Sequence, residues 1–341
     1  MIVGAVPPRL LVGAYRGGTA PTVRSSRTPP QRAPTIERVN AFKIGALFAA
    51  TAQLGFAAKA IFIKLAYAAH PALDAVTLLA LRMIFSLPFF LLMAWWARRQ
   101  NNAAHANAAP LTQRDWGYVL LLGFCGYYLA SFLDFWGLQY ISAGLERLIL
   151  FTNPTIVVLL SAVFFARPIT RRVALALAVS YVGLSLAYWH DLRTTDDVQA
   201  LMFGSFLVFA SAMSYAVYLL LSADVTKRIG SMRFTAYMML VATALVLIQF
   251  VIMRPLSALD LPVKIYVYCV GLAIFSTAAP VWMMAEALKR LGANDTSMIG
   301  SIGPVITIFL GALLLDESLS LLQLSGAALV LGGIALISMR R

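Results

Sequence analysis

The sequence predicts an all-α membrane protein, with ten transmembrane helices arranged as two inverted five-helix repeats. The composition, ten long apolar runs and a similarity between the two halves of the chain lead to this expectation. Of the 341 residues, 61% are hydrophobic and 12% are charged, whereas soluble domains contain roughly 45–50% apolar and about 25% charged residues. A soluble fold would leave much of this apolar surface in water, at about 25 cal/mol per Å². A lipid bilayer as the surrounding medium removes that penalty.

Ten apolar runs are long enough to cross a membrane, which takes about 20 residues in a helix. Only helices and closed barrels satisfy every backbone polar group in lipid, and continuous runs without period-2 alternation favour helices. The predicted spans are Phe42–Ala68, Ala75–Ala97, Trp116–Leu138, Ser142–Phe165, Arg172–Trp189, Ala200–Leu221, Phe234–Ile252, Val263–Leu288, Asn294–Leu315 and Leu321–Met339.

Lys and Arg residues concentrate in the segments that an alternating topology places on one side of the membrane. Cytoplasmic segments of membrane proteins carry such an excess, so we expect a multi-pass protein of the cytoplasmic (inner) membrane with both termini inside. The basic residues on this side include Arg9, Arg16, Arg24, Arg27, Arg32, Arg38, Lys43, Arg98, Arg99, Arg114, Arg167, Arg171, Arg172, Lys227, Arg228, Arg233, Lys289, Arg290, Arg340 and Arg341. The opposite loops hold most of the acidic residues. Because topology accounts for the net charge of +13, no nucleic-acid partner is expected.

Residues 1–41 differ from the rest of the chain in composition. They are rich in Pro, Ser, Thr and Arg, and we expect a disordered cytoplasmic tail. A misassigned start or a targeting segment are the alternatives. The two repeats are then expected at residues 42–190 and 191–341.

The second half of the chain resembles the first at a constant offset of 150 residues, without gaps, over residues 137–187. The offset pairs Pro154 with Pro304 and Gly183 with Gly333. It links span 4 to span 9 and span 5 to span 10, so each unit has five helices. Because five is odd, the second unit crosses the membrane in the opposite direction. Inverted repeats of this kind recur in secondary transporters, whose substrate site lies near the membrane midplane.

The stretch Ala287–Ile337, ALKRLGANDTSMIGSIGPVITIFLGALLLDESLSLLQLSGAALVLGGIALI, is similar to the second-half signature of the drug/metabolite transporter superfamily, EamA-type branch. Its marks include the helix with Pro304 and the turn at Glu317. The first half repeats the signature more weakly, and Arg82 matches the usual basic residue of the second span. The resemblance covers residues 42–339. It implies that the protein is a ten-helix secondary transporter of a small-molecule substrate and not an enzyme.

Two features depart from the family pattern. The family commonly has Glu in the turn after the proline-containing helix of both halves, whereas here Glu317 occupies the second position and Arg167 the first. Glu146 and Arg147 in span 4 also differ from the generic pattern. They indicate either a substrate preference of this subgroup or an internal salt bridge.

Several ionisable side chains lie inside the predicted spans, where a charge at a helix centre costs at least roughly 2.5–3.5 kcal/mol. Such groups mark a substrate or ion pathway, or they pair with one another. Six are expected in the outer half of the first repeat and the seventh near the cytoplasmic end of span 8: Lys59, Lys64, Arg82, Asp134, Glu146, Arg147 and Glu286. We interpret Lys64 as reaching to the interface. For Arg82 and Glu146 a structural ion pair competes with a pathway role, and Asp134 and Glu286 are candidate proton-binding carboxylates.

Asn153, Tyr215, Trp282 and Ser301 complete the candidate substrate pathway. Asn153 follows Glu146 by seven residues and shares its helix face, and Trp282 precedes Glu286 by four. Helix–helix packing by small and aromatic side chains is the competing explanation for these residues.

The sequence therefore predicts a secondary active transporter that exports a small polar metabolite such as an amino acid, driven by a proton gradient or by exchange. A lipid or lipid-linked sugar flippase and a non-transporting membrane enzyme or receptor are the alternatives. No P-loop, HExxH or GxSxG motif is present, and Cys125 and Cys269 lie in apolar runs without metal-ligand spacing. No cofactor, metal or catalytic residue is expected, and the protein is expected as a monomer or homodimer in the bilayer.

Overall fold

The computed structural model describes residues 35–104, 111–166 and 168–338. Within these ranges the chain forms helices joined by short turns, and it contains no strand there. Residues 1–34 of the predicted tail and Arg167 lie outside the described residues. The first helix begins at Thr35, seven residues before the first predicted span.

The helices follow the order of the predicted spans. They are α1 (Thr35–Ala69), α2 (Ala75–Ala104), α3 (Gln113–Gly123), the π-helix η1 (Phe124–Leu129), α4 (Ala130–Gly137), α5 (Ala143–Phe151), α6 (Asn153–Phe165), α7 (Arg171–Thr194), α8 (Val198–Ile229), α9 (Ser231–Met253), the 3-10 helix η2 (Leu256–Leu259), α10 (Val263–Ala273), the π-helix η3 (Ile274–Ala278), α11 (Ala279–Gly300), α12 (Gly303–Leu314) and α13 (Leu321–Ser338). Among the described residues, eight helical segments are long and apolar enough to cross a membrane, and α12 and α13 are shorter apolar helices.

Two predicted spans are interrupted. Thr152 separates α5 from α6, and the ninth predicted span is divided between the end of α11 and α12. In both cases a proline, Pro154 or Pro304, is the second residue of the new helix. Proline has no N–H to donate to the preceding turn, and its ring collides with the carbonyl four residues earlier. Each span therefore breaks just before its proline.

The turns collect at two ends of the helix bundle. One end, the Asp74 side, contains residues 70–74, 138–142, 195–197, 254–262 and 315–320. The other end, the Arg98 side, contains residues 111–112 and 168–170, Gly230 and a kink in α11 at Gly292. Asp74 pairs with Arg254 at 3.1 Å on the first side. On the second side Arg98 donates a hydrogen bond to Tyr237 at 3.2 Å.

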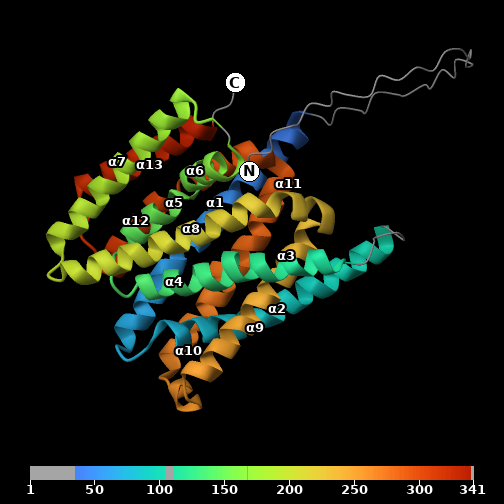
Figure 1. Cartoon of the computed structure of the whole chain (residues 1–341), viewed down its shortest axis with the longest axis horizontal. Coiled ribbons are helices and arrows are strands. Elements are labelled where there is room, and N and C mark those ends of the chain that lie inside the picture. Colours follow the sequence, from blue (N-terminus) through green and yellow to red (C-terminus); the bar gives the residue numbers. More distant parts are fainter. Residues whose placement is uncertain (1–34, 105–110, 167, 339–341) are drawn as a thin grey trace, which may run out of the picture.

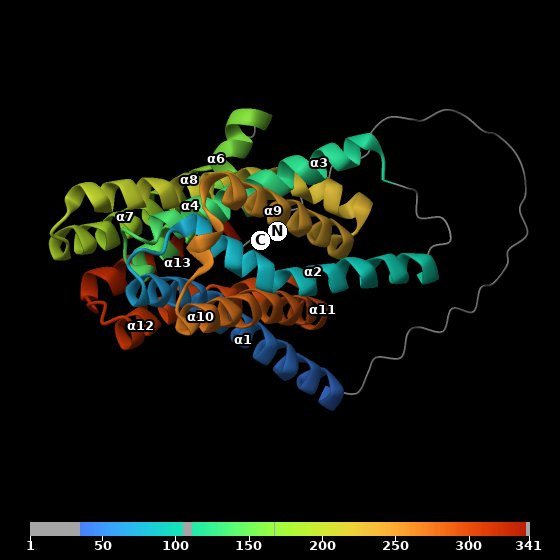
Figure 2. The ribbon, with the colours of Figure 1, turned by 90° about the horizontal axis from the view of Figure 1, so that it is seen from below.

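The second helix of each half, α2 and α9, lie antiparallel. Besides the contacts at the two ends, the Met83 sulfur in α2 accepts from the Thr243 hydroxyl in α9 at 3.8 Å. Figure 1 shows α2 and α9 on the flank opposite to α7 and α13, with α1 between these pairs. Seen from below, α3, α4 and α8 lie in one layer and α1, α10 and α11 in another (Figure 2).

The fifth span of each half, α7 and α13, also lie antiparallel and touch through glycines. A Cβ added to Gly183 would lie 2.5 Å from the Gly326 carbonyl oxygen, and one added to Gly333 would lie 2.6 Å from that of Ala176. Gly183 and Gly333 are 150 residues apart, as are Ala176 and Gly326. The two halves therefore make the same backbone contact reciprocally.

The π-helices also repeat at this offset. η1 begins at Phe124 and η3 at Ile274, and after the helix breaks α6 begins at Asn153 and α12 at Gly303. A π-helical turn is rare and is often found at functional sites. The duplication therefore extends upstream of residue 137 into spans 3 and 8, where comparison of side chains alone did not reveal it.

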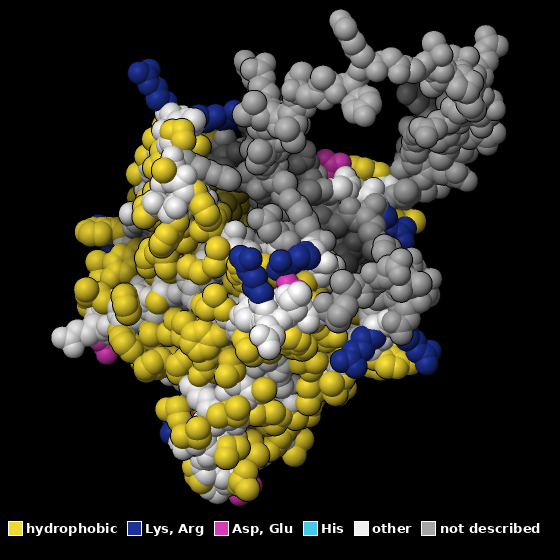
Figure 3. Space-filling model, turned by 45° about the vertical axis from the view of Figure 1, so that its right-hand side comes forward, with side chains coloured by type: hydrophobic (Ala, Val, Ile, Leu, Met, Phe, Trp, Pro, Cys, Tyr) yellow, Lys and Arg dark blue, Asp and Glu magenta, His cyan; other side chains and the backbone are white. Residues whose placement is uncertain are grey.

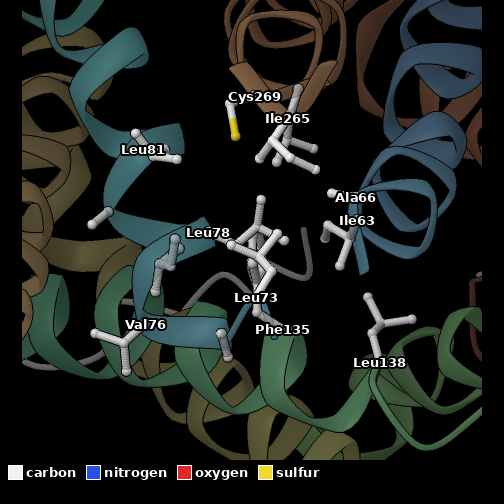
Figure 4. Close-up of a cluster of buried hydrophobic side chains, with 14 of the residues drawn as sticks. Ile63, Ala66, Leu73, Val76, Leu78, Leu81, Phe135, Leu138, Ile265 and Cys269 are labelled. Atoms are coloured by element: carbon white, nitrogen blue, oxygen red, sulfur yellow. The ribbon is translucent and has the colours of Figure 1, made fainter. Parts of the chain in front are cut away.

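Apolar side chains fill the interior and also cover the outside. Near the Asp74 side, Ile63, Leu78, Phe135 and Ile265 bring α1, α2, α4 and α10 together (Figure 4). Hydrophobic side chains also cover most of the described surface in Figure 3, with few Lys and Arg among them. The exposed large hydrophobics include Val163, Ile252 and Leu313 at 78%, 77% and 76%. Such a surface fits lipid rather than water.

Candidate functional site

The helices bring three charges of the first half into direct contact. The Lys59 ammonium on α1 lies 2.6 Å from Asp134 Oδ2 on α4 and 2.9 Å from Glu146 Oε1 on α5. The side chains are 17%, 5% and 0% exposed, respectively. The lysine contacts both carboxylates. Each charge of the group therefore has a partner of opposite sign, as charges inside a membrane domain require. We call Lys59, Asp134 and Glu146 the charge triad.

Arg82 on α2 joins the triad region to the second half of the chain. Its Nε donates to the Thr277 hydroxyl at 3.3 Å, and Thr277 belongs to the π-helix η3. One terminal nitrogen lies 3.5 Å from the Ser131 hydroxyl oxygen, and the guanidinium lies 5.3 Å from the Phe135 ring centroid. Arg82 therefore contacts two hydroxyl groups and an aromatic ring. It belongs to none of the ion pairs found among the described residues.

Arg147, the residue after Glu146, points toward the break between α11 and α12. Its guanidinium lies 5.1 Å from the Phe151 ring centroid. A Cβ added to Gly303 would lie 3.1 Å from an Arg147 terminal nitrogen and 2.9 Å from Gln53 Oε1. Gly303 thus leaves the space in which side chains of α1 and α5 approach the start of α12.

Several shielded polar atoms of α1, α5 and α6 have no hydrogen-bond partner. Arg147 Nε, Gln53 Oε1, Asn153 Oδ1 and Glu146 Oε2 are each shielded from solvent and have no hydrogen-bond partner. Buried polar atoms normally find a partner. Two of these residues, Gln53 and Arg147, both approach Gly303, and this place can therefore receive water or a ligand.

Threonine side chains stabilise the break between α5 and α6. The Thr152 hydroxyl donates to the Ile149 carbonyl at 2.6 Å, and the Thr155 hydroxyl donates to the Thr152 carbonyl at 2.6 Å. Both carbonyls also accept backbone N–H groups, from Thr152 at 3.0 Å and from Ile156 at 3.0 Å, so the hydroxyl groups add a second hydrogen bond to each. The break also changes the expected relation between Glu146 and Asn153, because seven residues no longer correspond to two turns of one helix.

A second polar group lies on the Asp74 side. Glu317 accepts from the Ala143 N–H at 2.8 Å and lies 3.5 Å from the Lys64 ammonium. Lys64 also donates to the Ile141 carbonyl at 2.7 Å. A carboxylate is favourable at the start of a helix, so Glu317 of the second half holds the beginning of α5 in the first.

The remaining sequence-predicted residues have other contacts. Tyr215 packs 5.2 Å from Tyr218, centroid to centroid. Trp282 is 58% exposed and packs edge-on against Phe48. Glu286 lies 3.5 Å from Arg290 in the next turn of α11.

Ser301 and Asn153 occupy the two helix breaks. Ser301 lies between α11 and α12, and Asn153 is the first residue of α6. Both are partly exposed. They lie at equivalent features of the two halves, but not at equivalent positions, because the residue 150 after Asn153 is Gly303.

Sequence reasoning missed Gln53 and Thr277. Gln53 is 7% exposed and Thr277 is 5% exposed. A search for ionisable groups inside the spans passes over both, since they carry no charge. Extending the same burial argument to amides would have identified Gln53, whereas Thr277 needed knowledge of the π-helix.

Comparison with known proteins identifies the family of this chain. The model of the EamA-like transporter family matches residues 43–189 and 202–339. A Bacillus subtilis (strain 168) protein, named uncharacterized transporter YcbK, is 31% identical over 303 residues, which are 86% of this chain and 93% of that protein.

More distant relatives agree. Uncharacterized transporter YyaM of the same organism is 23% identical over 216 residues, 63% of this chain and 70% of that protein. A crystal structure with 17% identity covers 86% of this chain and 96% of its own, with a TM-score of 0.57. That likeness supports the fold alone. The chain belongs to the EamA-like transporter family and is a multi-pass membrane protein.

Proposed function

We propose that this protein is a secondary active transporter that moves a small polar metabolite, such as an amino acid, by alternating access. The charge triad carries the proposal. Lys59, Asp134 and Glu146 come from three helices, lie inside an apolar domain and include a carboxylate oxygen without a hydrogen-bond partner. Charges that are expensive in lipid are typical of a substrate or ion pathway. The two signs together suit a substrate with both an ammonium and a carboxylate group.

The paired helices support alternating access. Equivalent helices, α7 with α13 and α2 with α9, lie antiparallel, and both halves contain a π-helix and a broken span at matching positions. We infer that the halves are inverted repeats. Transporters of this design use broken helices near the midplane to bind substrate and rock one repeat against the other.

The orientation in the membrane is proposed from charge, and the direction of transport from the likeness to the transporter family. The Arg98 side carries most of the basic residues of the loops, and we place it in the cytoplasm of a cell with the chain in its inner membrane. Export is proposed, with a proton gradient or exchange as the driving force. Asp134 and Glu146 are the proposed proton-binding groups, because two carboxylates share a single lysine, and one proton on either of them would balance the charge of the triad.

Exchange in liposomes tests this function without knowledge of the substrate. Purified protein is reconstituted into vesicles loaded with a ¹³C-labelled bacterial metabolite extract and is then placed in the unlabelled extract. Mass spectrometry identifies each metabolite whose label is exchanged. We expect exchange of a small set of polar metabolites, accelerated or driven by a pH difference.

Protein-free vesicles and the variant Asp260→Asn serve as controls, since Asp260 is an exposed loop residue. Absence of any exchange beyond that of empty vesicles would refute the transport of polar metabolites. Movement of a fluorescent lipid between leaflets, in the absence of metabolite exchange, would instead identify a flippase.

A further inference from the structure

We propose that Arg147 binds an anionic oxygen group of the substrate, a carboxylate or a phosphate, at the break between α11 and α12. This inference rests on the proposed transport function and assigns the chemical class of the substrate. It would make the transported metabolite an organic anion or an amino acid held by its carboxylate, and not an amine or a neutral sugar.

The first argument is the unpaired state of the guanidinium. No ion pair formed between described residues includes Arg147. Its Nε is shielded and has no acceptor, and its ring contact is with Phe151 on the same helix. A charged group in a membrane domain needs a counter-charge or an aqueous cavity. Glu146 and Asp134 attract the guanidinium electrostatically but do not contact it, and a substrate anion would supply a counter-charge in contact.

The second argument is the charge balance of the region. Lys59 has two carboxylates within 3 Å, at 2.6 and 2.9 Å. Arg82 and Arg147 add two positive charges, so three bases face two acids. One positive charge is left over, and Arg147 is the basic residue that contacts neither the carboxylates nor the hydroxyl groups that Arg82 uses. The site therefore attracts a net anion.

The third argument is space and direction at the helix break. Gly303 lacks the side chain that would touch Gln53 Oε1, Arg147 and Phe151. α12 starts at this glycine, so the positive end of its helix dipole faces the same place. The Gln53 Oε1 beside Gly303 has no partner, and as an acceptor it can take a hydrogen bond from an ammonium group of an amino-acid substrate. A guanidinium and a helix start are groups that bind carboxylates and phosphates.

A purely structural role for Arg147 predicts different behaviour. If Arg147 mainly supported the fold through Phe151, its removal would destabilise the protein. If Arg147 instead binds a substrate anion, the protein without substrate holds an uncompensated charge. Neutralising that charge then leaves the stability unchanged or raises it. The sign of the stability change therefore separates the two roles.

The experiment compares wild type, Arg147→Gln, Arg147→Lys and the control Arg193→Gln, since Arg193 lies exposed at the end of α7. Thermal unfolding of the purified full chain in detergent is measured alone and with single probes. The probes are amino acids, 2-oxo acids and sugar phosphates, each beside its uncharged amide, amine or sugar counterpart.

We expect some anionic probes to raise the Tm of wild type and of Arg193→Gln, while their uncharged counterparts do not. Arg147→Gln should have an unliganded Tm equal to or above wild type. Its affinity for the same probes should fall about 10- to 100-fold, as for loss of a hydrogen bond to a charged group. Arg147→Lys should retain part of the response. Carboxylate and phosphate probes separate the two possible sources of the anion.

Three results would overturn the inference. One is a lower unliganded Tm in Arg147→Gln with probe responses intact. Another is the absence of a Tm response of wild type to every anionic probe. The third is metabolite exchange in liposomes that involves only amines or neutral compounds, which would leave the transport function standing. Absence of all exchange refutes the transport function itself.

Discussion

The two halves of this protein share a frame but differ in chemistry. Both contain a π-helix, a broken proline-containing span and a glycine contact between their last helices, all at an offset of 150 residues. The charges are not shared. Positions equivalent to Asp134, Glu146 and Arg147 hold Met284, Thr296 and Ser297. Duplicated backbone features thus form the frame that is proposed to move, while the proposed substrate chemistry is concentrated in the first half.

The turns after the broken spans differ in the same way. Glu317 of the second half holds the start of α5 through the Ala143 N–H, whereas its equivalent in the first half is Arg167. A carboxylate thus fastens the start of the broken span on the Asp74 side. The equivalent position of the first half offers a base instead.

The largest expected effect is on the charges that only the first half has. Lys59→Met should lower the free energy of unfolding by about 3–5 kcal/mol, because it leaves two buried carboxylates without their cation. Thermal or chemical unfolding in detergent measures this. The triple variant Lys59→Met, Asp134→Asn, Glu146→Gln should recover most of the loss. A single-variant loss below about 1 kcal/mol, typical of exposed pairs, would contradict the buried triad.

Smaller losses of stability, similar in the two halves, are expected at the glycine contacts between α7 and α13. Gly183→Ala and Gly333→Ala each place a Cβ within 2.6 Å of a backbone carbonyl on the partner helix. Overpacking of this kind costs about 1–3 kcal/mol, and the two variants should lose similar stability. The exposed Gly117→Ala, with no atom within 4 Å of its added Cβ, is the matched control. A large loss in only one of the two variants would contradict the reciprocal contact.

The smallest expected effect is at the contact between Glu317 and the start of α5. Glu317→Gln weakens a charge-assisted cap of α5, and caps contribute about 0.5–2 kcal/mol. Its unfolding midpoint should shift less than that of the glycine variants. Hydrogen exchange at the beginning of α5 should accelerate, while exchange in α9 stays unchanged. Unaltered protection around Ala143 would show that the cap is unimportant.

Much of the fold follows from the sequence, because lipid imposes length and polarity on each span. The apolar runs and the offset of 150 residues identify the spans and the duplication, whereas the spans with Pro154 and Pro304 were predicted as continuous and are broken in the structure. The pairing of Lys59 with both Asp134 and Glu146 does not follow, since helix rotation and tilt depend on packing. The π-helices at Phe124 and Ile274 leave no side-chain pattern, because they are set by the backbone.

The candidate site was predicted in its charges but not in its surroundings. Lys59, Asp134 and Glu146 were found because ionisable groups are rare in membrane spans. Trp282 was included by helix spacing, but the structure packs it against Phe48 at the surface. Residue spacing identifies neighbours on the same helix, but it does not identify the helix that a side chain faces.

The most direct test of the central claim, that the charges of the first half form the transport site, compares Glu146→Gln with Thr296→Val. Thr296 is the equivalent residue of the second half, and it donates to the Gly292 carbonyl at 2.7 Å. Metabolite exchange is measured in liposomes at equal amounts of folded protein. Glu146→Gln leaves the Lys59–Asp134 pair balanced, so the fold should persist while exchange falls about tenfold or more. Thr296→Val should exchange near the wild-type rate. Wild-type exchange by folded Glu146→Gln would contradict the account.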